Sequence, residues 1–156
     1  MFFKNKLGVL TLAILVILLT FTFIQPYLPN QKDPIKVHND PVTGMQIRNQ
    51  PPSADFWFGS NNIGQDLWAR IWQGTRNSMF IGFTVAIINS CVGILVGILW
   101  GYVRKLDFLF TELYNVLDNI PSTIVLILAS YVLNPSISTI IIAMCVTGWI
   151  GVARTI

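Results

Sequence analysis

The sequence is short of charge. Of its 156 residues only 11% are Asp, Glu, Lys or Arg, whereas 53% are hydrophobic. In ordinary soluble domains about a quarter of the residues are charged. This composition therefore excludes an ordinary soluble protein and indicates a protein that lies in a membrane. No stretch gathers enough lysine and arginine to form a nucleic-acid-binding surface, so we expect no nucleic-acid partner.

Cysteine and histidine are also scarce, which excludes several kinds of site. Cys91 and Cys145 lie in separate apolar runs, far along the chain from the single histidine, His38. Because a metal centre needs several ligands close together, no metal site is predicted. We interpret both cysteines as packing residues and His38 as a solvated loop side chain. No Ser–His, Cys–His or paired-carboxylate set lies at one depth of the bilayer, so no catalytic residue is predicted and a membrane enzyme is the least favoured class.

The chain opens with a membrane anchor. Lys4 and Lys6 precede an uncharged run over residues 7–24, a pattern that fits either a signal peptide or an anchor. The run ends in bulky residues where a signal peptidase needs small ones, which favours the anchor. Residues 25–58 follow as a polar loop in which several prolines block regular helix. We therefore divide the chain into residues 1–24, 25–58 and 59–156.

Three further spans are predicted after this loop. The second span covers residues 79–103, which contain no Asp, Glu, Lys or Arg, and the fourth covers 138–152, closed by Arg154. The apolar run at 120–133 is short for a bilayer. Extending this third span back to about residue 113 makes it long enough, but holds Asp118 near one end. It also places Pro121 in the first turns, where it kinks the helix or resets the backbone.

Basic residues near the ends of the four spans set their orientation. If four helices cross the membrane, five basic residues fall close to span ends on one side. Those on the other side are spread over a long loop and balanced by aspartates. By the positive-inside rule, both ends of the chain are predicted in the cytoplasm. The residues on the basic side are Lys4, Lys6, Arg104, Lys105 and Arg154.

A short helix at the membrane surface is predicted after the loop, and it feeds directly into the second span. Asn61, Asn62 and Gly64 supply turn and capping chemistry ahead of Asp66, which stands four residues before Arg70. Tryptophans in this segment favour the headgroup region. The residues leave open whether the helix is a plain anchor or takes part in gating.

Small residues line one face of the second span and predict a helix-packing seam, because lipid supplies no hydrophobic drive for helix association. They are Ala86, Ser90, Gly93, Gly97 and Gly101. Asn89 is polar at mid-membrane and is expected to face protein or a water-filled path. With Asn119 and Pro121 it forms our candidate translocation path.

The stretch ahead of the second span resembles a pattern of the "C"-type permease subunits of bacterial ABC importers for dipeptides, oligopeptides and nickel. The family pattern is G-T-D-x-x-G-R-D-x-x-S-R-x-x-x-G-x-R-x-S. The similarity continues through Gly101-Tyr102, Pro121, Trp149 and Arg154. The chain departs from the family at Asn61 and Gln65, where the family has Asp and Arg. The motif positions here include Gly59, Asn62, Gly64, Asp66, Arg70, Gly74, Arg76 and Ser78.

The resemblance implies an all-α integral membrane protein with six spans, of which four are counted here. The family's cytoplasmic E-A-A-x(3)-G loop, which docks on the ATPase, is expected after Arg154 and two further spans behind it. The sequence stops at Ile156. We therefore expect residues 59–156 to be an incomplete permease domain, either the N-terminal portion of a longer subunit or a truncated gene product.

The resemblance also implies a function in the bacterial cytoplasmic membrane. The chain is expected to pair with a homologous permease subunit, with two cytoplasmic ATP-binding subunits and an extracellular substrate-binding lipoprotein. It is expected to bind no cofactor itself. Peptides are the implied substrates, with nickel as the lesser option. Asp66, Arg70 and Arg76 then either stabilise the junction or contact peptide. The alternative is a truncated, non-transporting membrane protein that binds a partner permease through the glycine seam.

Overall fold

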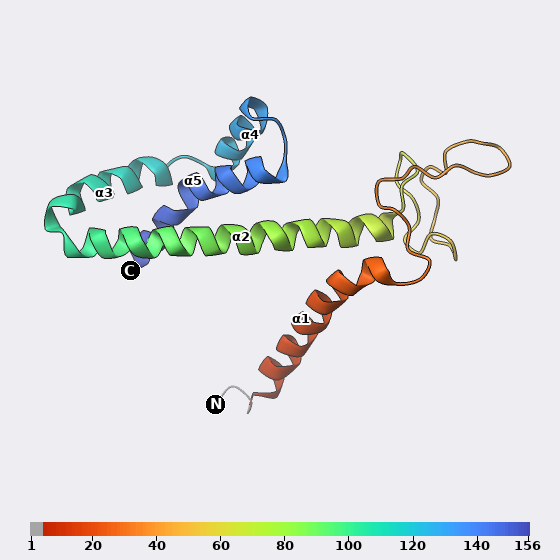
Figure 1. Cartoon of the computed structure of the whole chain (residues 1–156), viewed down its shortest axis with the longest axis horizontal. Helices are drawn as coiled ribbons and strands as arrows, with labels where there is room; N and C mark the ends of the chain where they lie inside the picture. The colour runs from red at the N-terminus through yellow and green to blue at the C-terminus, as the bar shows by residue number, and fades with distance from the viewer. Residues whose placement is uncertain (1–4) are drawn as a thin grey trace. The chain divides into compact units, whose positions relative to one another are not determined.

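The computed structural model describes residues 5–156, which form five α-helices and one short 3-10 helix (Figure 1). Two isolated β-bridges are the strand-like pairings within that range. Three helices are long and apolar enough to cross a membrane, and a fourth span is added if two bent helices count as one. The prediction of an all-α membrane protein is confirmed. The chain divides into two compact units, one ending at Asn77 and the other covering Ser78–Ile156.

Helix α1 (Lys6–Ile24) is the predicted anchor. Its first turn is capped by Asn5, whose side chain accepts hydrogen bonds from the backbone of Leu7 and Gly8 at 3.1 and 3.2 Å. The chain then enters the 3-10 helix η2 (Gln25–Tyr27), with a proline early in its only turn. A helix interrupted by proline leaves the chain free to turn away from the membrane.

The loop between η2 and the next helix folds back on itself. An antiparallel bridge joins Asn39 to Gln46, and a second joins Ser60 to Asp66. His38 stands between the two, because its backbone amide donates to Gly64 at 2.8 Å and its carbonyl accepts from Ile47 at 2.9 Å. From its sequence, the loop was known only to be polar and rich in proline. In the structure, backbone hydrogen bonds hold it together.

Helix α2 (Leu67–Tyr102) runs for 36 residues. The predicted surface helix, from Leu67 to Asn77, passes without a break into the second span, and the two form one helix. No proline interrupts it, and glycine alone does not stop a helix. At about 1.5 Å per residue, α2 is about 54 Å long, against about 30 Å of hydrocarbon. The Trp-bearing first turns therefore extend beyond the apolar part of a bilayer.

The third predicted span is broken rather than continuous. Helix α3 (Arg104–Asp118) begins just after α2 ends, and α4 (Ser122–Val132) follows a sharp break. The two axes are bent by 78°. Pro121 is the N-cap of α4 rather than a kink inside one helix. The reason is steric, since a proline disfavours helical geometry in the residue before it, here Ile120.

Helix α5 (Ile137–Thr155) matches the predicted fourth span. The chain reaches it from α4 through a tight turn in which Asn134 has a φ of 67°. Ser136 caps the new helix by accepting from the backbone of Thr139 at 3.1 Å. Such a short connection makes α4 and α5 antiparallel neighbours.

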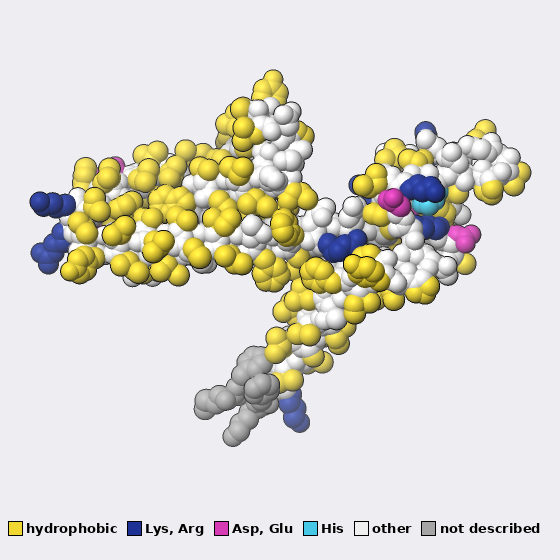
Figure 2. Space-filling view, in the orientation of Figure 1, with side chains coloured by type: hydrophobic (Ala, Val, Ile, Leu, Met, Phe, Trp, Pro, Cys, Tyr) yellow, Lys and Arg dark blue, Asp and Glu magenta, His cyan; other side chains and the backbone are white. Residues whose placement is uncertain are grey.

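Helices α2 and α5 run parallel within the second unit. Asn89 of α2 meets Gly148 of α5, Gly93 meets Val152, and Gly97 meets Ala153, so contacts advance together along both helices. Figure 2 shows hydrophobic side chains over most of the visible face of this unit, with Lys and Arg at the end where α2 gives way to α3. Helices α3 and α4 lie between these two candidate spans along the chain and count as a further candidate span only when they are taken together.

Candidate functional site

The motif ahead of α2 folds as a tight turn. Gly59 and Gly64 both have positive φ angles, 76° and 78°, which glycine adopts without strain. Between them the Ser60 hydroxyl donates to the carbonyl of Ile47 at 2.5 Å and accepts from the amide of Gln50 at 3.0 Å. The turn is therefore joined directly to the loop that precedes it.

The two positions where the chain departs from the family pattern contact each other. The Asn61 side-chain amide donates to Oε1 of Gln65 at 3.0 Å, and Gln65 Nε2 donates to the carbonyl of Ile35 at 2.7 Å. Only 6% of Gln65 is exposed. Where the family pattern has an acid and a base, this chain has a neutral amide pair that still forms hydrogen bonds. Replacing both charges together avoids a buried unpaired charge.

Asp66 and Arg70 stand four residues apart, but their side chains have different partners. Oδ1 of Asp66 accepts from the amide of Trp68 at 3.3 Å, which caps the start of α2. The exposed Arg70 guanidinium donates to Oε1 of Gln65. Asp66 is buried, with 4% exposed. Both residues therefore stabilise the turn and the beginning of α2.

Arg76 joins α2 to the end of α1. Its Nη1 donates to the carbonyl of Thr22 at 3.2 Å and to Oε1 of Gln25 at 3.1 Å. Thr22 and Gln25 are the most deeply buried side chains among the described residues, with 1% and 2% exposed. A cation near the last carbonyls of a helix is favourable, because those carbonyls are its negative end. The remaining motif positions Asn62, Gly74 and Ser78 are exposed.

An aromatic cluster surrounds this junction. Phe21 of α1 packs edge-on against Trp72 with ring centroids 4.7 Å apart, and Trp68 packs against Trp57 and Phe58 at 5.1 and 5.0 Å. Such edge-on and tilted packing is the preferred geometry of aromatic pairs. Tryptophan favours the headgroup region, so the cluster is placed to hold the junction at the membrane surface.

In the structure, only some positions of the predicted seam on α2 are buried against another helix. Gly93 and Gly97 are buried against α5, where an added β-carbon would lie 2.6 Å from Cβ of Val152 and 2.7 Å from the Ala153 carbonyl, respectively. The other three seam positions, Ala86, Ser90 and Gly101, are exposed. The close approach of the two helices therefore depends on the two middle glycines.

The candidate path residues lie in two different places. Asn89 is 9% exposed and its amide lies against Gly148, while its Oδ1 has no hydrogen-bond partner among residues 5–156. Asn119 and Pro121 are exposed at the break between α3 and α4. Asn89 thus belongs to the α2–α5 contact, and its role in a path stays a prediction.

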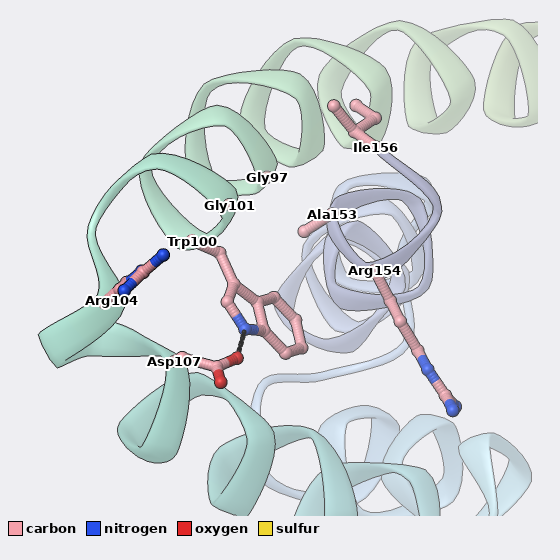
Figure 3. Close-up of a pocket in the computed structure, with 8 residues that line it drawn as sticks. All are labelled: Gly97, Trp100, Gly101, Arg104, Asp107, Ala153, Arg154 and Ile156. Carbon is pink, nitrogen blue, oxygen red and sulfur yellow. Dashed lines mark hydrogen bonds between the residues drawn. The ribbon is translucent and has the colours of Figure 1, made fainter.

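A cavity of about 360 Å³, which the sequence did not predict, opens where α2, α3 and α5 meet (Figure 3). Trp100 reaches from α2 and donates through Nε1 to Oδ1 of Asp107 at 2.9 Å, and its ring stacks on Phe110 at 5.6 Å. Figure 3 shows Arg104 and Arg154 on opposite sides of the Trp100 ring. These contacts fix the first turns of α3 against α2.

His38 lies in the loop outside the spans. Its ring packs edge-on against Phe56 at 5.4 Å, and its buried Nε2 has no partner among the described residues. Burial, with a smaller contribution from the positive charges of Lys32 and Lys36, lowers the pKa of His38 below its ordinary value. The solvated histidine of the sequence prediction is therefore half-buried and favours its neutral form.

A pH dependence of stability follows from this pKa. Since the unfolded chain binds the proton more readily than the folded one, the contribution of His38 is present above its ordinary pKa of about 6.5 and is lost as pH falls below it. We expect thermal unfolding, followed by tryptophan fluorescence in detergent, to shift downward between about pH 7.5 and pH 5.5. The shift is expected to be smaller in His38→Gln. Equal shifts in both proteins would contradict the assignment.

The sequence is similar to that of several known proteins. A family model described as the N-terminal TM domain of oligopeptide transport permease C matches residues 1–52. The chain is 37% identical over 154 residues to the dipeptide transport system permease protein DppC of Bacillus subtilis. It is 35% identical over 154 residues to the oligopeptide transport system permease protein AmiD of Streptococcus pneumoniae, and 32% identical over 160 residues to OppC of Bacillus subtilis. Over nearly its whole length, the chain is therefore similar to these peptide transport permeases.

The alignments cover nearly all of this chain but only about half of each relative. These three alignments cover 98%, 97% and 99% of this chain but 46%, 48% and 49% of the relatives. The chain therefore spans about half the length of the curated relatives that it matches. The junction motif, the broken third span and the α2–α5 contact all lie inside the region shared with these permeases.

Proposed function

We propose that the chain is part of the permease of an ABC importer that carries dipeptides or oligopeptides across the bacterial cytoplasmic membrane. The observation that carries this is the similarity along nearly the whole chain to three relatives whose names state dipeptide or oligopeptide transport. Peptide is favoured over nickel as the substrate for the same reason.

The proposal includes the partners that such an importer requires. A second, homologous permease subunit completes the pathway, cytoplasmic ATP-binding subunits supply the energy, and an extracellular lipoprotein delivers substrate. With both ends of the chain in the cytoplasm, the loop between α1 and α2 and the aromatic junction face the exterior. Lys6, Arg104, Lys105 and Arg154 then lie on the cytoplasmic side, as the positive-inside rule favours.

The proposal is tested by uptake in cells that lack the gene. We expect its deletion to abolish uptake of a radiolabelled dipeptide or tetrapeptide, and a restored wild-type copy to recover it. Uptake of radiolabelled nickel is the matched control and is expected to stay unchanged. Normal peptide uptake in the deletion strain would overturn the proposal, and loss of nickel uptake alone would replace its substrate.

A further inference from the structure

Arg76 is a half-buried cation whose partners are neutral. Its hydrogen bonds within residues 5–156 go to the Thr22 carbonyl and to Gln25 Oε1. The Thr22 carbonyl is available because Pro26, four residues later, has no backbone N–H to donate to it. The end of α1 supplies only a partial negative charge, about half a unit. The groups that hold Arg76 therefore do not balance its full positive charge.

A cavity of about 310 Å³ lies next to this arginine, and all of its lining residues belong to the first unit. Besides Arg76, the charged residues that line it are Lys32 and Asp33. The Asp33 carboxylate accepts from the backbone amide of Ile35 at 2.8 Å, and the Lys32 ammonium lies over the Phe56 ring. Two positive charges and one negative charge leave the cavity with an excess of positive charge.

Both helices at this junction place Arg76 at the level of the lipid head groups. The uncharged run of α1, Leu7–Ile24, is about 27 Å long, close to the thickness of the hydrocarbon core of about 30 Å, and Gln25 follows it directly. On α2 the uncharged run Asn77–Tyr102 begins directly after Arg76 and extends about 39 Å. With that run centred on the core, Arg76 lies about 5 Å beyond its edge, inside a head-group layer that is about 5–7 Å thick.

We propose that this cavity binds the phosphate of an anionic phospholipid, in the leaflet on the side of the loop between η2 and α2. The guanidinium of Arg76 has donors left over from its two junction contacts, and arginine binds phosphate through paired N–H groups. The excess positive charge favours phosphatidylglycerol over phosphatidylcholine, whose choline carries a positive charge of its own. The bound head group then supplies the negative charge that the junction lacks.

A purely structural role for Arg76 makes a different prediction. In that role its hydrogen bonds to Thr22 and Gln25 are its whole contribution, and the charge of the cavity has no effect on lipid binding. A substitution that changes this charge and keeps the junction contacts therefore separates the two roles. Asp33→Asn is such a substitution, because asparagine keeps the side-chain oxygen that accepts from Ile35.

Lipid binding at this site is measured by the quenching of tryptophan fluorescence. Trp100→Phe and Trp149→Phe are combined in the full chain, so that the remaining tryptophans all lie in the first unit; they are Trp57, Trp68 and Trp72. Trp68 donates to Gln31, which lines the cavity, at 3.2 Å. The protein is reconstituted in phosphatidylcholine vesicles, and phosphatidylglycerol with bromine near the start of one acyl chain is titrated in as the quencher. Brominated phosphatidylcholine is the reference lipid.

We expect phosphatidylglycerol to bind about fivefold more tightly than phosphatidylcholine, the factor that one basic residue near the surface supplies for an anionic lipid. Arg76→Gln is expected to remove this preference, and Arg76→Lys to keep part of it. Asp33→Asn is expected to strengthen phosphatidylglycerol binding by up to about fivefold. The matched control is Asp40→Asn, which makes the same change of charge in the same loop but outside the cavity lining, and it is expected to leave the preference unchanged.

Three results would overturn the proposal. The first is the same lipid preference in Arg76→Gln as in the parent protein, and the second is the same effect of Asp33→Asn as of Asp40→Asn. The third is relief of the quenching by added inorganic phosphate, which would mean that the site takes a free anion rather than a lipid. Asp33→Asn keeps the test decisive if Arg76→Gln does not fold. Quenching needs no transported solute, so its outcome is independent of the proposed function.

Discussion

Replacing Gly93 with leucine is expected to separate α2 from α5 and to destabilise the second unit strongly. A β-carbon at this position would lie 2.6 Å from Cβ of Val152 and 2.9 Å from the Trp149 carbonyl. Backbone atoms cannot rotate away, so the helices have to move apart. In well-packed interiors such overpacking costs roughly 1–3 kcal/mol, and a leucine at a backbone contact is expected at the upper end, about 3 kcal/mol.

Gly101→Leu is the matched control. Gly101 lies on the same helix, two i, i+4 intervals after Gly93, but no atom comes within 4 Å of a β-carbon added there. The measurement is the melting temperature of the detergent-solubilised protein, followed by the fraction that still elutes as a folded species after heating. We expect a clear decrease for Gly93→Leu and a small change for Gly101→Leu. Equal melting temperatures would show that the α2–α5 contact does not determine stability.

The seam illustrates what sequence spacing can and cannot predict. Glycines and other small residues three or four apart predicted one packing face, but that spacing combines two neighbouring rows of the helix. Val85, Asn89, Gly93 and Gly97 are buried and follow a single row of i, i+4 positions, as ridges-into-grooves packing favours. Ala86 and Ser90 lie on the next row. Which row faces α5 depends on the crossing of the two helices, which sequence spacing does not contain.

The helices themselves were largely predictable, because long apolar runs with charged ends have one physical solution in a bilayer. The surface helix continues into the second span as one helix, since nothing in the sequence between them forces an end. One detail was not predicted. The third span broke instead of extending, because the constraint that Pro121 places on Ile120 outweighs the helix propensity of the flanking residues.

The junction contacts were beyond sequence reasoning for another reason. Gln65 donates to the carbonyl of Ile35, thirty residues away, and Arg76 binds the end of α1 more than fifty residues away. Spacing within the motif indicated a local pair between Asp66 and Arg70. In the structure, Asp66 and Arg70 instead contact Trp68 and Gln65, respectively. The side chains that join the motif to the distant loop and to the first span are Gln65 and Arg76. Tertiary contacts of this kind leave no periodic signal in the chain.

A second large effect is expected at the turn itself, where Gly59→Ala is predicted to unfold the loop between η2 and α2. Two terms act together. A φ of 76° is strained for alanine by about 1–2 kcal/mol. In addition, the new methyl group would lie on the carbonyl oxygen of Gln50, a backbone atom that also holds the turn by accepting from the amide of Ser60 at 3.1 Å. Together we expect a loss of roughly 3 kcal/mol or more.

Gly44→Ala separates these two terms. Gly44 has a similar φ of 69°, but no atom comes within 4 Å of its added β-carbon, so alanine there has the strain without the overlap. The measurement is the rate at which trypsin cleaves after the exposed Arg48 in the detergent-solubilised protein, because local unfolding exposes the backbone to the protease. We expect much faster cleavage in Gly59→Ala than in Gly44→Ala. Equal rates would mean that conformational strain alone explains why glycine occupies this turn, and that the packing of Gly59 against Gln50 contributes little to the junction.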